Sequence, residues 1–397
     1  MGVLRLLFPG GPPDARWATG LALSQVTALL TATSAISSTA LAQREANLPA
    51  WQSFFVYVLL AAFYVPIYAR YRALESERQS AVASEASAGL EPPPPTGTGT
   101  SANAPAGVTA SRSLRRYAAL AVIDTQANYL IVKAFGYTSL TSVTLLDCAA
   151  IPFSMALSRL ALGDSYTRRH MLGGAVSVVG IAILVLADAD GRRGGREDEG
   201  SDPFLGDVIV LLAALLYASS NVLQESALLD GASGTEVLAH VGAIGAAVSG
   251  AQCLTFEYGD LAKLRAATGL GGVAEMATFA ISLFAMYSLT PEVLRRCGAA
   301  AFNVGMLSSD VWAAVARVAL FGGFGGTGAA VSFVISFATV SAGLVLFASA
   351  GDPLPPDRKA DPESRYAPLE EDLAVVAADL EGGTSSSGAT TARISST

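Results

Sequence analysis

Charged residues are scarce in this chain, and their scarcity indicates its class. Asp, Glu, Lys and Arg make up 15% of the 397 residues, whereas hydrophobic residues make up 52%. Soluble globular domains are about one quarter charged. Here long apolar runs, separated by short charged stretches, recur through most of the sequence, and about 20 such residues span a bilayer as a helix. The composition excludes an ordinary soluble domain and predicts an all-α polytopic membrane protein.

Residues that carry enzyme chemistry are also few. The chain has two histidines, His170 and His240, and three scattered cysteines, so we expect neither a metal site nor a disulfide framework. The sequence contains no HExxH motif, no GxSxG motif and no P-loop, which argues against a metalloprotease, a serine hydrolase and an ATP-driven pump. We therefore expect no enzyme activity and no cofactor.

The apolar runs predict ten membrane spans, joined by loops of very different length. They lie near residues 17–41, 50–70, 115–137, 140–162, 169–188, 204–228, 235–256, 271–290, 298–321 and 325–349. The first span ends in a sequence similar to a signal-peptidase site, but its apolar region is longer than a signal peptide requires. The predicted order is a cytosolic N-terminus (1–16), two helices (17–71), a disordered cytosolic linker (72–114), eight helices (115–350) and a disordered acidic cytosolic tail (351–397).

Loop charge and internal similarity predict the topology. With the N-terminus inside, the inner loops carry about twice as many Lys and Arg residues as the outer loops, which favours two cytosolic termini. "AFGYTSL" around Tyr137 is similar to "FAMYSLT" around Tyr287, and "ALSRLAL" around Arg159 is similar to "AVARVAL" around Arg317. These matches favour a duplication of five spans. Because five is odd, the prediction is a 5+5 inverted-topology repeat of ten transmembrane helices, an architecture found in transporters.

One stretch of the sequence resembles a known family. "DTQANYLIVKAFGYTSLTSVTLLDCAAIP" at 124–152 is similar to the third and fourth helices of the F branch of solute carrier family 35. Similar matches are "FLGDVIVLLAALLYASSNVLQE" at 204–225, "VSGAQCLTFEY" at 248–258 and "FNVGMLSSDVW" at 302–312. The resemblance thus covers nearly the whole membrane region, roughly residues 20–350. That branch belongs to the drug/metabolite transporter superfamily and is related to the nucleotide-sugar transporters. The resemblance implies a ten-helix carrier with both termini in the cytosol.

Polar residues inside the predicted spans are the candidates for a substrate or proton pathway. A charge inside a membrane costs at least about 2.5 kcal/mol on insertion scales, so such groups usually face a cavity or a partner. In the third span Asp124 and Asn128 share one face, whereas Lys133 and Tyr137 share another, which predicts a central helix. The other candidates are Asp147 in the fourth span, Tyr217, Asn221 and Glu225 in the sixth, and Asn303 and Asp310 in the ninth.

Several of these residues have a structural explanation as an alternative. Asp124 could act only as a hydrogen-bond or salt-bridge partner. Lys133 and Asp147 could form a buried ion pair between neighbouring helices. Glu225 lies near the predicted cytosolic end of its span, where simple solvation explains it.

The polar inventory favours a secondary-active carrier that works by alternating access. A nucleotide sugar carries at least two negative charges, whereas the predicted interior offers Lys133 against Asp124, Asp147 and Asp310. This balance favours a neutral or cationic organic metabolite, such as a nucleobase-like, nucleoside-like or drug-like compound. The alternatives are a nucleotide-sugar antiporter and a non-transporting receptor or scaffold. The expected partners are this small molecule and the lipid bilayer; a homodimer stays open, and no nucleic acid is expected.

The tail carries one short motif. "YAPL" at Tyr366–Leu369 has the Tyr-x-x-hydrophobic form that clathrin adaptors bind as an extended peptide. It favours the plasma membrane or endosome over the Golgi.

Overall fold

The structure is a computed structural model that describes residues 15–43, 48–87, 106–134, 137, 143, 146–192, 203–260, 269–309, 311–312, 327–351 and 353. Every regular element within these residues is helical, which confirms the predicted all-α class for the part of the chain described. The elements are α2 (Ala15–Gln43), α3 (Pro49–Ser87), α4 (Ala106–Ala134), α6 (Ala150–Ala161), α7 (Arg168–Arg192), α8 (Pro203–Leu229), α9 (Gly234–Phe256), the short 3₁₀ helix η1 (Tyr258–Asp260), α11 (Leu270–Met306) and α13 (Thr327–Ala348).

Five of these helices are long and apolar enough to cross a membrane. The stretches are Trp17–Ser38, Pro49–Glu77, Phe204–Leu229, Gly234–Phe256 and Gly271–Met306. Shorter apolar stretches lie at Ala150–Ala161 and Val334–Ala348. Two predicted spans, 271–290 and 298–321, meet within α11, where Gly298 interrupts the helical conformation with φ 78° and ψ 168°. The described helices thus give five candidate spans by length and composition. This number is smaller than the ten spans that the sequence predicts.

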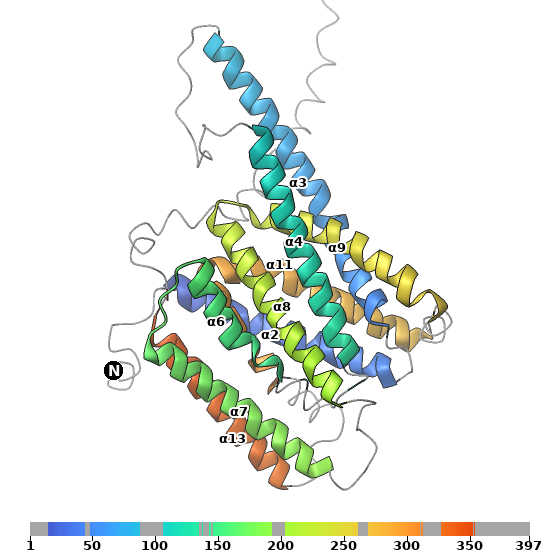
Figure 1. The fold of residues 1–397 in the computed structure, drawn as a ribbon, viewed down its shortest axis with the longest axis vertical. Coiled ribbons are helices and arrows are strands. Elements are labelled where there is room, and N and C mark those ends of the chain that lie inside the picture. The colour runs from blue at the N-terminus through green and yellow to red at the C-terminus, as the bar shows by residue number, and fades with distance from the viewer. Residues whose placement is uncertain are drawn as a thin grey trace, which may run out of the picture.

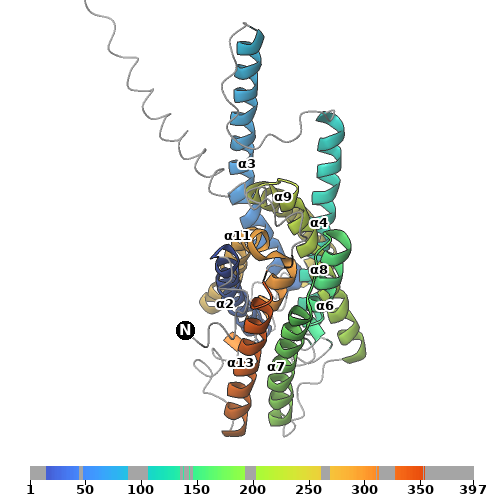
Figure 2. The ribbon, with the colours of Figure 1, turned by 90° about the vertical axis from the view of Figure 1, so that its left-hand side faces the viewer.

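The predicted linker at 72–114 begins and ends within helices. Helix α3 continues to Ser87 and α4 starts at Ala106, so only residues 88–105 of this segment lie outside the described part. Ten of the sixteen residues 72–87 are Ala, Glu, Arg or Gln, which are strong helix formers. This local propensity extends α3 although the segment has little apolar surface to bury. Both helices project beyond the bundle at the same end (Figures 1 and 2).

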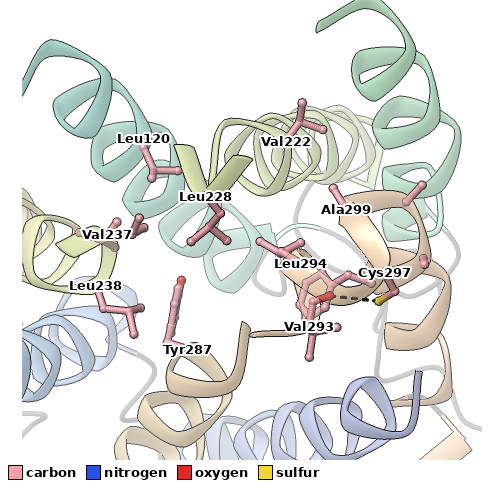
Figure 3. Packing of buried hydrophobic residues seen from close by; sticks show 14 of the residues in the cluster. Leu120, Val222, Leu228, Val237, Leu238, Tyr287, Val293, Leu294, Cys297 and Ala299 are labelled. Atoms are coloured by element: carbon pink, nitrogen blue, oxygen red, sulfur yellow. Dashed lines mark hydrogen bonds between the residues drawn. The ribbon is translucent and has the colours of Figure 1, made fainter. Parts of the chain in front are cut away.

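The helices associate mainly in pairs that are distant in sequence. Helix α2 packs along α11, α3 along α9 and α7 along α13, while α4 and α6 both pack on α8. The main apolar cluster fills the space between α4, α8, α9 and α11 (Figure 3). Leu120 of α4, Val237 of α9 and Leu294 of α11 are almost inaccessible to solvent there. This cluster holds the polar residues of α4 and α8 at the centre of the molecule.

Helices α7 and α13 approach so closely that their backbones touch. A Cβ atom placed on Gly173 would lie 2.5 Å from the backbone nitrogen of Phe347. One placed on Gly343 would lie 2.2 Å from Oγ of Ser177. The small residues at 173–180 therefore serve close helix packing, the role that small residues spaced four apart have between membrane helices. The two helices run side by side at the end of the molecule opposite the projecting ends of α3 and α4 (Figures 1 and 2).

Gly173→Ala is expected to separate this pair and to destabilise the protein by about 1–3 kcal/mol, the usual cost of overpacking. Its neighbour gives a matched control, because a Cβ on Gly174 meets its nearest atom, Cγ2 of Ile151, at an ordinary 3.4 Å. Thermal unfolding of both variants in nanodiscs measures the difference. Equal unfolding midpoints for Gly173→Ala and Gly174→Ala would contradict the close approach of α7 and α13.

Candidate functional site

A set of six polar side chains from four helices meets at the centre of the bundle, and we call it the central network. Its members are Tyr57 of α3, Asp124 and Asn128 of α4, Tyr217 and Ser220 of α8, and Tyr287 of α11. Asp124 is only 5% exposed. The hydroxyls of Tyr57 and Tyr287 donate to its Oδ2 at 2.7 and 2.6 Å, and Ser220 donates to Oδ1 at 2.8 Å. Both oxygens of this buried carboxylate are therefore occupied.

Asn128 closes the network one helical turn away. Its Nδ2 donates to the hydroxyls of Tyr57 and Tyr287 at 2.8 and 2.6 Å, and its Oδ1 accepts a hydrogen bond from Tyr217 at 3.0 Å. With Asp124 ionised, every hydroxyl proton and both amide protons of Asn128 have an acceptor. In this conformation Asp124 acts as the hydrogen-bond partner that the structural alternative described.

The predicted polar stripe on α8 is a line of contacts with α4 and α11. Tyr217 bonds to Asn128 of α4, and Asn221 Nδ2 donates to Oδ1 of Asn303 on α11 at 3.3 Å. One turn further, Oε2 of Glu225 accepts a hydrogen bond from the backbone N–H of Ala299 at 2.8 Å. All three predicted residues of α8 thus contribute to the packing of α8 inside the bundle.

The expectation that Glu225 is solvated is wrong. Its side chain is 1% exposed, because it satisfies the start of the helical segment that follows Gly298. The first N–H groups of a helix have no partner within the helix, and a carboxylate is the most favourable acceptor for them. Gly298 has φ 78°, and a Cβ on it would lie 2.9 Å from Oε1 of Glu225. Both the backbone conformation and the crowding require glycine at this position.

The ion pair of Lys133 and Asp147, which the structural alternative proposed, does not form. Nζ of Lys133 lies 3.4 Å from the hydroxyl of Tyr129 and 5.3 Å from the centre of its ring. Lys133 lies in the last turn of α4, so its flexible side chain packs on the ring one turn earlier. Asp147 makes no ion pair and no hydrogen bond within the described residues, and its Oδ1 is buried without a partner.

Two further candidates lie apart from the central network. Tyr137 is half-buried in a turn just after α4, where its N–H bonds to the carbonyl of Ala134 at 2.9 Å. Asp310 lies outside the described residues. The network also contains Tyr57, Ser220 and Tyr287, which the sequence did not single out. A hydroxyl within an apolar run gives little signal in the sequence. Of these three residues, only Tyr287 gave a signal, through its similarity to Tyr137 in the proposed repeat.

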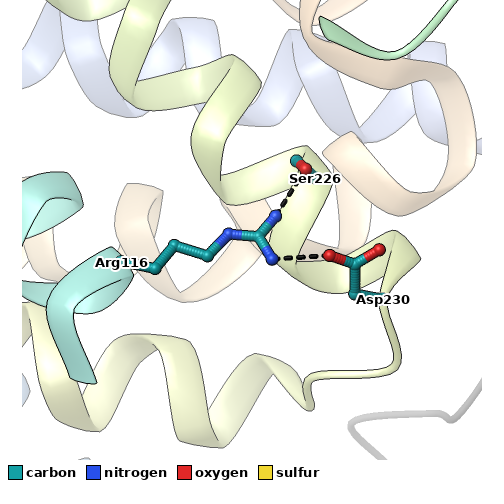
Figure 4. Close-up of polar contacts among 3 residues, drawn as sticks. All are labelled: Arg116, Ser226 and Asp230. Carbon is teal, nitrogen blue, oxygen red and sulfur yellow. Dashed lines mark hydrogen bonds and ion pairs between the residues drawn. The ribbon is translucent and has the colours of Figure 1, made fainter. Parts of the chain in front are cut away.

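Polar contacts also join helix ends on either side of the central network. Glu257, just beyond α9, accepts hydrogen bonds from the backbone N–H groups of Ala50 and Trp51 at 2.8 and 3.2 Å, and so joins α9 to the start of α3. Burial raises the pKa of the Glu257 carboxyl, and these two N–H donors oppose the increase. Arg116 of α4 contacts Asp230 and Ser226 at the far end of α8 (Figure 4).

Comparison with known proteins places this helical bundle in a family of membrane proteins. The SLC35F model of solute carrier family 35 matches residues 14–82 and 108–349, and the chain belongs to this family, as its resemblance predicted. It is an integral membrane protein. Solute carrier family 35 member F2 of Mus musculus is 36% identical over 255 residues, which are 64% of this chain and 64% of that protein. The corresponding protein of Xenopus tropicalis is 32% identical over 237 residues, 59% of each chain.

The chain thus spans slightly less than two thirds of the length of these curated relatives. A solved crystal structure superimposes with a TM-score of 0.56, covering 83% of this chain and 96% of its own. With 13% sequence identity, this similarity shows a shared fold.

Tyr287→Phe is expected to lower stability by about 1–3 kcal/mol, because it removes one of the two donors to Oδ2 of Asp124 and one of the acceptors of Nδ2 of Asn128. Tyr258→Phe is the matched control, since Tyr258 is 66% exposed. Thermal unfolding in nanodiscs gives both shifts. If Tyr287→Phe unfolds at the same temperature as Tyr258→Phe, the central network does not stabilise the bundle.

Gly298→Ala is expected to destabilise the protein more than Gly231→Ala. Both glycines have positive φ, 78° and 91°, so each alanine costs roughly 1–2 kcal/mol in the left-handed region. Gly231 has no atom within 4 Å of a built Cβ, whereas Gly298 has Glu225 there. The extra loss of Gly298→Ala in thermal unfolding measures the displacement of Glu225. Equal losses would mean that the Glu225 contact contributes nothing.

Proposed function

We propose that the protein is a secondary-active transporter of a small organic metabolite, built from ten transmembrane helices as a 5+5 inverted repeat. The observation that carries this proposal is the pairing of the helices. In the proposed numbering, α2, α3, α4, α6 and α7 are the first five spans. Helices α8 and α9, the two parts of α11 and α13 are the last five.

The pattern of the strongest helix pairs stays the same when each of the first five spans is exchanged with the corresponding span of the last five. The second span packs on the seventh (α3 on α9) and the fifth on the tenth (α7 on α13). The first span packs on the eighth and ninth (α2 on α11), and correspondingly the sixth packs on the third and fourth (α8 on α4 and α6). An inverted repeat produces this exchange symmetry and places its substrate site at the repeat interface. A receptor or scaffold has no need of it.

The pairing also defines two bodies that contain helices from both repeats. One consists of α2 and α11, and the other of α4, α6 and α8. Tyr287 with Asp124, Asn221 with Asn303, and Glu225 with the N–H of Ala299 form a polar seam between them. Hydrogen bonds of this kind exchange with water at a net cost of only about 0.5–1.5 kcal/mol each. A seam of such contacts can open and close, as alternating access requires.

The charges along this seam support a neutral or cationic substrate. Asp124 is bonded to neutral hydroxyls only, and Asp147 has no basic partner within the described residues. Lys133 interacts with Tyr129. A nucleotide sugar, the alternative substrate class, needs several cations to offset its phosphates. We therefore favour a nucleobase-like, nucleoside-like or drug-like compound, carried at the plasma membrane or endosome.

Uptake into proteoliposomes tests the proposal, with cationic and uncharged nucleosides and drug-like amines compared against UDP- and GDP-sugars. We expect uptake of a compound from the first group. Asn221→Leu should abolish this uptake because it removes the bond to Asn303 within the seam. Ser219→Leu is the control, because within the described residues the side chain of Ser219 bonds to its own helix at Leu215.

Uptake of nucleotide sugars alone would establish the antiporter instead. Binding without uptake of any compound would favour the receptor or scaffold. Equal uptake by Asn221→Leu and the native protein would show that the seam is not part of the transport pathway.

A further inference from the structure

Three acids of the bundle, each with at least one buried carboxylate oxygen, differ in how their carboxylates are satisfied. Asp124 accepts hydrogen bonds from three hydroxyls. Glu225 accepts one from the backbone N–H of Ala299. Asp147 has a buried oxygen, Oδ1, and within the described residues neither a hydrogen bond nor an ion pair reaches this side chain. Of these three acids, Asp147 is the one whose charge no group within the described residues compensates.

An ionised carboxylate in this position is unfavourable. Burying a charge without a partner is strongly unfavourable in a folded protein, and inside a membrane no bulk water reduces that cost. The cation that the sequence offers as a partner, Lys133, instead lies against Tyr129. A proton is the smallest ligand that removes the charge without any rearrangement of the surrounding helices.

The position of Asp147 links it to the moving parts. It precedes α6, which belongs to the body of α4 and α8. Helix α6 also packs on α11 of the other body. The titratable groups connected with Asp147 are Tyr217 of α8 and, through Tyr217, Asp124 of α4 and Tyr287 of α11. Tyr217 interacts electrostatically with both Asp147 and Asp124, and also with Tyr287. A change of charge at Asp147 is thus felt at Tyr217, whose hydroxyl donates to Asn128 in the central network.

We propose that Asp147 binds and releases the proton that drives transport, and that Asp124 does not. The proton passes from bulk water on one side to a carboxylate oxygen of Asp147, which becomes neutral while the seam is closed. When the seam opens to the other side, the carboxylic acid releases that proton to water and ionises. The coupling role rests on the proposed transport function, whereas the proton site itself does not.

Asp124 is unsuited to this role because its oxygens are already used. A proton added to Asp124 lies between a carboxylate oxygen and a hydroxyl that already donates a hydrogen bond to that oxygen. One donor must then turn away, and in the network each of these hydroxyls is held by a second contact or by burial. Asp147 gains a proton without the loss of any hydrogen bond recorded in the described structure.

Infrared difference spectroscopy of the full-length protein in nanodiscs, titrated with acid and base, tests the proton site without any substrate. We expect a protonated-carboxyl band that titrates reversibly in the native protein, persists in Asp124→Asn and is lost in Asp147→Asn. Asp147→Glu keeps a carboxyl group and should restore a titrating band at a shifted frequency. A band that is unchanged in both Asp147 variants, or that only Asp124→Asn removes, would overturn the proposal.

Two further measurements distinguish loss of the proton site from misfolding and from loss of transport. If Asp147→Asn does not give a monodisperse protein, the band of Asp147→Glu decides, because a frequency identical to that of the native protein excludes Asp147 as its source. Absence of any titrating band in the native protein also overturns the proposal. Failure of uptake in proteoliposomes with the band intact would reject the proposed transport function but keep the proton site.

Discussion

The carboxylate of Asp124 imposes the constraint on which the centre of this bundle depends. Inside a membrane it finds no water, so neighbouring helices must supply its hydrogen-bond donors. Tyr57, Ser220 and Tyr287 supply them from positions 67, 96 and 163 residues away in the chain. One buried charge thereby determines that α3, α4, α8 and α11 meet, and the apolar cluster around Leu120 and Leu294 fills the remaining space.

The same physical requirement explains two other acids. A helix start leaves N–H groups without acceptors, and in an apolar environment a carboxylate from a distant segment supplies one. Glu225 does this for the helical segment that follows Gly298, and Glu257 does it for the start of α3. Both acids are buried, and both look like solvated residues near span ends when only the sequence is read. Their role comes from the partner, which local sequence does not reveal.

Two kinds of helix contact occur in different parts of the molecule. Between α7 and α13, glycines allow backbone contact over Gly173 and Gly343, and such a close fit has no second low-energy arrangement nearby. Between α8 and α11, the contacts are single hydrogen bonds such as that of Asn221 with Asn303. These bonds can be replaced by water or by a substrate. The proposed pathway therefore follows the polar contacts, while the glycine-packed pair holds the frame.

The sequence by itself determined the class, the approximate positions of the apolar helices, the family and the central place of α4. These follow from local properties, namely apolar run length, helical spacing and a specific motif around Asp124. The stripe of Tyr217, Asn221 and Glu225 was also visible, because residues four apart share a helix face. Only the tertiary structure decided which partner each polar group has. It placed Lys133 against Tyr129 instead of Asp147, buried Glu225 and recruited Tyr57. Hydrogen bonding acts over about 3 Å, and no pattern along the chain specifies which distant atoms come that close.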